Sequence, residues 1–141
     1  MRFMMLMYPG IKAEVPVPSE KDISAMMKFN EELTKSGALL SLDGLHPTAA
    51  GARVRYQGGK PTVTDGPFTE AKEVVGGYWM IQVKSKEEAI EWAKKVPAGD
   101  GEMVEIRRVF EMSEFDIDPG SDVNGQVERV GKGLEANKHR A

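Results

Sequence analysis

The stretch GGYWMIQVKSKEEAIEWAKKVP, residues 76–97, contains a strand, a helix start and a helix in direct succession. Residues 78–83 are apolar on both alternating faces, which is typical of a strand covered on both sides. Ser85, with Glu88 three residues later, forms a capping box, and Pro97 ends the helix that follows. The apolar stripe of this helix consists of Ala89, Ile90, Trp92, Ala93 and Val96. The stretch therefore predicts one strand–helix unit.

A second strand–helix unit lies at the amino terminus. Residues 2–8 are again apolar on both faces, Ser19 is a helix N-cap, and Gly37 is placed to end the helix in a left-handed cap. We expect its apolar face to contain Ile23, Met26, Met27, Leu33 and, beside them, Phe29. A short extended segment, 38–42, follows.

Two further strands and a hairpin complete the pattern. Residues 52–57 alternate and are expected as the second strand of the sheet, with Gly58-Gly59 turning into a partner strand, 60–64, that Pro61 places at an edge. Residues 103–110 form the last strand. This order predicts an α+β, ferredoxin-like (split βαβ) fold, in which an antiparallel four-stranded sheet carries two helices on one face.

Length and composition limit the alternatives. We expect one domain over residues 1–115, followed by a tail, 116–141, that forms a loop and a short frayed helix or is disordered. The net charge of −3 and the pI near 5.5 argue against a nucleic-acid surface. The apolar amino terminus is too short for a secretory signal or a membrane helix of ~20 residues, so we expect a cytoplasmic protein with no membrane partner.

Metal and cofactor sites are not expected either. The sequence contains no cysteine, and one loop histidine among scattered carboxylates lacks the spacing of metal ligands. No phosphate loop, dinucleotide fingerprint or nucleophile elbow is present.

The two helices leave one face of the sheet uncovered. If Trp79, Ile81 and Val83 face the helices, Tyr78 and Met80 face away, together with the alternate residues of a methionine-rich first strand. In the last strand, Val104, Ile106 and Phe110 are expected to point inward, which places Glu105 and Arg107 on the far face. That face is too apolar for water, so we expect a homodimer packed sheet to sheet around a cavity.

Arginines are the candidate ligand-binding residues of that cavity. Arg53, Arg55 and Arg107 would hold an anionic group of a small molecule, and Tyr78 would face the same space. The alternative is that these side chains form solvated or cross-strand ion pairs.

His46 and Asp65 are the candidate catalytic residues. Outside the tail, His46 is the only side chain whose ordinary pKa allows proton exchange near neutral pH, and either Asp43 or Asp65 could form an acid–base unit with it. The alternative is a histidine that caps or packs a loop.

The motif TDGPFTEAKE, residues 64–73, admits two interpretations. Asp65 would make an Asx-type turn and Pro67 would begin a short helical turn, 67–73, so that the motif is a rigid corner. In the functional interpretation Asp65 is a general base or orients an imidazole, and Phe68 walls a pocket.

Three stretches of this sequence resemble the YCII-related family, specifically its DGPF-motif branch. The likeness includes VTDGPFTEAKEVVGGYWMIQVKSKEEAIEWAKKVP, GLHP followed by GARVR, and the opening MRFMMLMY, over roughly residues 1–115. The resemblance implies a dimeric α+β barrel. It also implies a link to extracytoplasmic-function sigma factors. Some relatives are thought to use a histidine on the first helix with an aspartate; residues 19–36 contain no histidine, so that dyad does not carry over.

Two functional hypotheses follow. The first is a cytoplasmic homodimer that binds a small molecule between its sheets and acts as an acid–base enzyme of unknown reaction. The second is a non-catalytic regulatory or sensing dimer associated with a sigma factor. The first requires His46 or Asp65 to open into a pocket with the arginines, and the second predicts that these residues are spread over the surface.

Overall fold

The computed structural model describes residues 1–10, 18–68 and 73–140. The chain divides into two compact units, Met1–Val109 and Phe110–Ala141, which are described separately. The first unit contains β1 (Arg2–Tyr8), α1 (Glu20–Lys35), β2 (Leu39–Gly44), a 3-10 turn (Thr48–Ala50), β3 (Ala52–Gln57), β4 (Lys60–Asp65), β5 (Gly77–Gln82), α2 (Lys86–Ala93) and β6 (Met103–Arg108).

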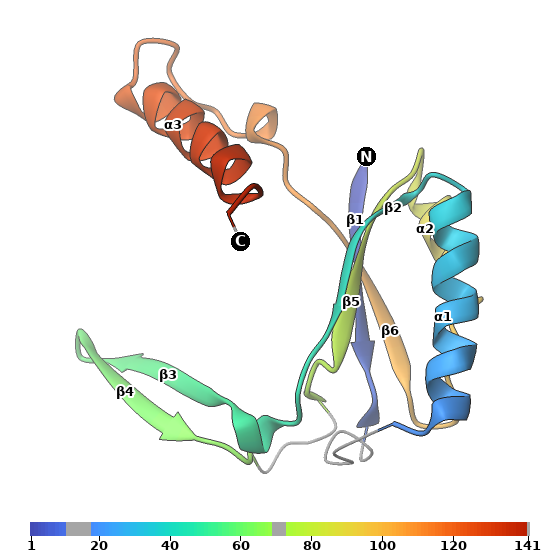
Figure 1. The fold of residues 1–141 in the computed structure, drawn as a ribbon. Helices are drawn as coiled ribbons and strands as arrows, with labels where there is room; N and C mark the ends of the chain where they lie inside the picture. The colour runs from blue at the N-terminus through green and yellow to red at the C-terminus, as the bar shows by residue number, and fades with distance from the viewer. Residues whose placement is uncertain (11–17, 69–72, 141) are drawn as a thin grey trace. The chain divides into compact units, whose positions relative to one another are not determined.

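The main sheet has four strands in the order β2-β5-β1-β6, and every neighbouring pair is antiparallel. Figure 1 shows α1 and α2 on the same face of this sheet. Strand order and helix placement are those of the split βαβ arrangement, so the expected ferredoxin-like α+β fold is confirmed.

Local capping signals set the helix starts where the sequence places them. At the start of α1 the Ser19 hydroxyl accepts a hydrogen bond from the Asp22 amide. At the start of α2 the Ser85 hydroxyl accepts one from the Glu88 amide. Gly37 has φ of 83°, the left-handed conformation expected of the residue that follows α1. The side-chain oxygens thus satisfy amides that a helix start leaves unpaired.

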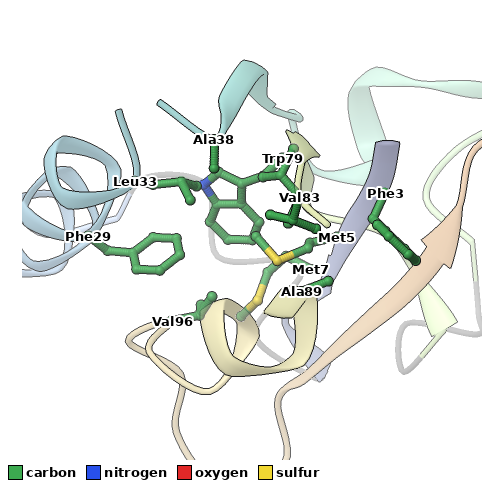
Figure 2. Packing of buried hydrophobic residues seen from close by; sticks show 11 residues of the cluster. Phe3, Met5, Met7, Phe29, Leu33, Ala38, Trp79, Val83, Ala89 and Val96 are labelled. Atoms are coloured by element: carbon green, nitrogen blue, oxygen red, sulfur yellow. The ribbon is translucent and has the colours of Figure 1, made fainter. Parts of the chain in front are cut away.

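The core lies between the sheet and its two helices (Figure 2). Along β1 and β5 every second residue is buried, and α1 contributes Phe29 and Leu33. The Phe29 ring meets Trp79 edge to face, with 5.5 Å between ring centroids. Ile23 and Met27 were also expected on the buried face of α1, but they are 43% and 51% exposed, because the helix turns Phe29, Asn30 and Leu33 toward the sheet instead.

The hairpin corrects one expectation. Residues 52–57 are not the second strand of the main sheet; β3 and β4 form a separate two-stranded sheet, joined by Gly58 and Gly59 with positive φ. The place beside β5 is taken by β2, because its Leu39 and Leu42 pack against the core, whereas Val54 and Tyr56 of β3 are exposed.

The carboxyl-terminal unit also departs from expectation. Instead of a short frayed helix, α3 spans Asp122–Asn137, sixteen residues. The Ser121 hydroxyl accepts the Val123 amide, and Lys132 pairs with Glu128 at 3.1 Å, so capping and charge pairs offset the glycines in the helix. Phe110, expected to point into the sheet core, is 71% exposed and its ring lies against Phe115.

No helix in the described part of the chain combines the length and apolar character needed to cross a membrane.

Candidate functional site

The second face of the main sheet carries no helix from the described residues of Met1–Val109 (Figure 1). Strand register places the Met4–Met80 and Leu6–Tyr78 pairs side by side on this face, because residues directly opposite in antiparallel strands point the same way. All four are half-buried, whereas their neighbours Phe3, Met5, Trp79 and Ile81 on the helix side are buried. We call the face that contains Met4, Leu6, Tyr78 and Met80 the open face.

Tyr78 and Asp43 form a hydrogen-bonded pair at the β2 side of the open face. The two residues are cross-strand neighbours, and the Tyr78 hydroxyl donates to Asp43 Oδ2 at 2.7 Å. The hydrogen bond to this carboxylate raises the pKa of the Tyr78 phenol, and partial burial and the negative charge of Asp43 act in the same direction. Ser41 opposes the shift. The pair therefore favours the protonated form of the phenol.

A pocket of about 130 Å³ lies where β2 ends and β5 begins, next to α1. Its lining is mostly apolar, with three polar or ionisable members. The lining residues that matter for chemistry are Met7, Met26, Leu42, Trp79, Asn30, Asp43 and Tyr78.

Glycines allow the backbone to close around this pocket. A Cβ on Gly77 would lie 2.9 Å from the carbonyl oxygen of Asp43, closer than real Cβ atoms approach. The neighbouring Gly76 accepts the Leu45 amide at 2.9 Å. These close contacts fix the backbone of Asp43 against β5 and so hold the Asp43–Tyr78 pair in place.

Asn30 is a candidate functional residue that sequence reasoning missed. Its side chain is only 7% exposed, and its Oδ1 accepts a hydrogen bond from Trp79 Nε1 at 2.8 Å. The signal in the sequence was a polar residue inside the apolar row formed by Met26, Phe29 and Leu33, which implies a buried amide with a specific partner.

The predicted catalytic residues lie elsewhere in the fold. His46 is exposed, two residues beyond the end of β2, and Asp65 is exposed at the end of β4, opposite Ala52. Neither lines the pocket described above. Asp43, considered as a partner for His46, instead accepts a hydrogen bond from the Tyr78 hydroxyl. The catalytic roles of His46 and Asp65 stay predictions.

The predicted arginines occupy two different sheets. Arg107 lies opposite Met4 on the open face, as expected. Arg53 and Arg55 belong to the hairpin, and the Arg53 guanidinium lies 4.0 Å from the centre of the Phe68 ring. Phe68 thus contacts an arginine of the hairpin.

The DGPF motif has the geometry of a corner. The Gly66 amide donates to the Gly51 carbonyl at 2.9 Å, and the Phe68 amide donates to Thr48 Oγ1 at 3.4 Å. A Cβ on Gly66 would collide with the Thr48 carbonyl oxygen, so only glycine fits. The Gly66–Pro67 peptide is cis. The expected helical turn falls largely on residues 69–72, outside those described.

Among the residues with described positions, no group of three or more His, Cys, Asp or Glu side chains could hold a metal ion. The polar or ionisable residues that line the pocket are Asp43, Tyr78 and Asn30.

Comparison with known proteins gives a family, a relative in sequence and a solved structure with a partial likeness of fold. The model of the YCII-related domain matches residues 1–113. An uncharacterized protein of Rhizobium meliloti is 36% identical over 74 residues, a match that spans 52% of this chain and 57% of that protein's length. Among solved structures, 5-chloro-2-hydroxyhydroquinone dehydrochlorinase from Burkholderia phenoliruptrix, in complex with 2,5-dihydroxybenzoquinone, is 13% identical, with a TM-score of 0.44, and covers 82% of this chain and 100% of its own.

Proposed function

This chain belongs to the YCII-related domain family, and from that premise we propose that it is a small-molecule-binding homodimer with an acid–base pair at its site. Two copies pack their open faces together. The ligand occupies the pocket beside Asp43 and Tyr78, which these two residues border at one edge of the open face.

The apolar centre of the open face supports the dimer. Met4, Leu6 and Met80 form a contiguous group on adjacent strands, and each keeps part of its surface exposed. A second copy buries such a patch efficiently, because a two-fold axis brings identical surfaces together. The same packing would withdraw the Tyr78–Asp43 pair from water, which strengthens its electrostatic effect on a ligand.

The single observation that supports acid–base chemistry at this site is the 2.7 Å hydrogen bond from Tyr78 to Asp43. A carboxylate is a proton acceptor and a phenol is a proton donor, so the pair can take a proton from a bound molecule and return one. His46, two residues beyond β2, is the second acid–base candidate of this proposal, with Asp65 as its predicted partner.

The test is a thermal-shift screen of small metabolites, followed by calorimetric titration of the hits. We expect a ligand whose affinity falls at least tenfold in Asp43→Asn and in Tyr78→Phe, because each change removes one half of the pair. Tyr56→Phe is the matched control, since Tyr56 is 79% exposed on the hairpin, and it should bind as the wild type does. Ligands bound equally by all four proteins would contradict the proposed site.

A non-catalytic regulatory dimer is the second candidate, and one observation favours it. His46, Asp65 and Arg55 are exposed rather than gathered around a pocket, which is the pattern that a sensing or sigma-factor-binding module predicts. In that case the wild-type chain would show no turnover, and Asp43→Asn would weaken ligand binding alone. Binding of an extracytoplasmic-function sigma factor, measured with and without ligand, separates the two candidates: turnover that Asp43→Asn abolishes supports the enzyme, and ligand-dependent sigma-factor binding without turnover supports the module.

A further inference from the structure

The carboxamide of Asn30 is fixed in one orientation by its neighbour. An indole N–H can only donate, so the hydrogen bond from Trp79 Nε1 at 2.8 Å requires the oxygen of Asn30, not its nitrogen, to face Trp79. Trp79 is itself held by the edge-to-face contact with Phe29. The Asn30 Nδ2 group therefore points away from the indole, with two N–H donors to satisfy.

Those donors have a poor partner inside the protein. Among the described residues, Asn30 Nδ2 meets one acceptor, the thioether sulfur of Met27, at 3.7 Å. A thioether is a weak hydrogen-bond acceptor, and the asparagine is 7% exposed, so water replaces the missing partner poorly. Such a buried amide retains the capacity to bind an acceptor oxygen.

Asn30 also lines the pocket of about 130 Å³, together with the apolar side chains of Met7, Met26 and Leu42. An apolar cavity of about 150 Å³ accommodates a benzene molecule, so the volume of this pocket suits one small ring or a branched chain of similar size. The charged residue among its described lining is Asp43, and that lining includes no lysine or arginine. An anion would therefore be repelled at this position, and an uncharged molecule would not.

We propose that Asn30 donates a hydrogen bond to the ligand, and that the ligand is a small uncharged molecule with an apolar body and one carbonyl-type oxygen. This inference rests on the proposed function and narrows it, because the arginines of the sequence hypothesis lie on the hairpin and on β6, away from this lining. Trp79 is a positioning residue here: its indole N–H holds Oδ1 of Asn30, which leaves Nδ2 as the end of the amide that can donate to a ligand.

Three probes of similar shape test the inference on the full chain. Acetophenone has the ring and the carbonyl oxygen, ethylbenzene lacks the oxygen, and benzoate carries a charge. The chain contains two tryptophans, so their indole N–H signals in a two-dimensional nuclear magnetic resonance spectrum are few, and Trp92→Phe identifies the Trp79 signal. We expect acetophenone to shift the Trp79 signal and to bind about tenfold more tightly than ethylbenzene or benzoate.

Asn30→Asp is the matched variant, because it keeps an oxygen for Trp79 and removes both N–H donors. Its acetophenone affinity should fall about tenfold, toward that of ethylbenzene, while the Trp79 indole signal stays in its hydrogen-bonded position. Should this variant fail to fold, the comparison of the three probes on the wild-type chain still decides the question.

Equal binding of ethylbenzene or benzoate would overturn the inference, and so would the absence of a Trp79 shift with all three probes. Failure of the inference is distinguishable from failure of the proposed function. If the metabolite screen still yields a ligand that Asp43→Asn weakens, the site stands and only the role of Asn30 and the ligand class are wrong.

Discussion

The two faces of the four-stranded sheet are built from alternate residues of the same strands, yet they are buried to very different degrees. Met5 and Ile81 on the helix side are fully buried, whereas Met4 and Met80, one residue away, are only half-buried. The chemistry differs too. The helix side places its polar group, Asn30, inside the core and bonds it to Trp79, and the open face carries Tyr78 and Asp43 on its surface.

Apolar character alone therefore does not distinguish a sheet face that is buried in the core from one that stays partly exposed. Both faces are rich in methionine and leucine or isoleucine, but the helices described for this unit cover only one of them (Figure 1). The open face therefore has surface left to bury, and the pocket lies at the edge where both faces meet, lined by residues of each.

The largest expected effect is a difference in stability between variants of two neighbouring residues in β5, Ile81 and Met80. Ile81→Ala should lower the free energy of unfolding by roughly 2–5 kcal/mol, because it leaves a cavity in a fully buried site. Met80→Ala should cost roughly 1 kcal/mol or less within one subunit, since its side chain is half-buried. Urea unfolding measures both.

The stability costs of Met80→Ala and Ile81→Ala should depend differently on protein concentration. If a second copy covers the open face, the cost of Met80→Ala grows as concentration rises, and that of Ile81→Ala does not. Equal costs for the two variants at every concentration would show that the two faces are buried alike.

The next effect tests the edge where the faces meet. Gly77→Ala should destabilise by roughly 1–3 kcal/mol, because its Cβ would press on the carbonyl oxygen of Asp43. Gly44, paired with Gly77 in the adjacent strand, has open space and no positive φ, so Gly44→Ala should be close to neutral. Thermal unfolding of both variants checks this, and a neutral Gly77→Ala would show that the backbone of Asp43 does not lie this close to Gly77 in solution.

The smallest effect concerns the polar pair of the open face. The Asp43 carboxylate raises the pKa of Tyr78, so Asp43→Asn should return that pKa toward its ordinary value of about 10. Ultraviolet titration of tyrosinate measures it, in a background where Tyr8→Phe and Tyr56→Phe leave Tyr78 as the single tyrosine. An unchanged pKa would mean that the hydrogen bond does not persist in solution.

The raised pKa of Tyr78 also makes the stability of the fold depend on pH in the alkaline range. A pKa raised in the folded state favours the neutral phenol there, so the contribution of Tyr78 is fully present below about pH 10 and is lost as pH rises through the folded pKa. The wild-type chain should therefore lose stability above about pH 10 more steeply than Asp43→Asn does. Denaturant midpoints at a series of alkaline pH values measure the difference.

Local signals in the sequence predicted much of the first unit. The N-caps at Ser19 and Ser85, the Gly58-Gly59 turn and the inward alternation of Trp79 and Ile81 all depend on residues a few positions apart, and all are confirmed. The ferredoxin-like fold followed from the order of these elements, and the family from the likeness of its sequence blocks.

Long-range pairing was harder to predict. Whether β2 or β3 lies beside β5 depends on which side chains reach the core. The sequences of both segments are compatible with a strand, so the local pattern does not choose between them. The Tyr78–Asp43 and Trp79–Asn30 bonds join residues 35 and 49 positions apart, so no local pattern reveals them. The helix α3 was underestimated because its glycines lower intrinsic propensity, while its cap and charge pairs act against that effect.

The most direct test of the central claim is the mass of the full chain in solution at micromolar concentration, by sedimentation equilibrium. The open face predicts a dimer, twice the 15.5 kDa of one chain, and Met80→Arg should reduce it to 15.5 kDa while circular dichroism remains that of the folded protein. A wild-type chain that sediments at 15.5 kDa, or a dimer that Met80→Arg leaves intact, would contradict the claim that a second copy covers this face.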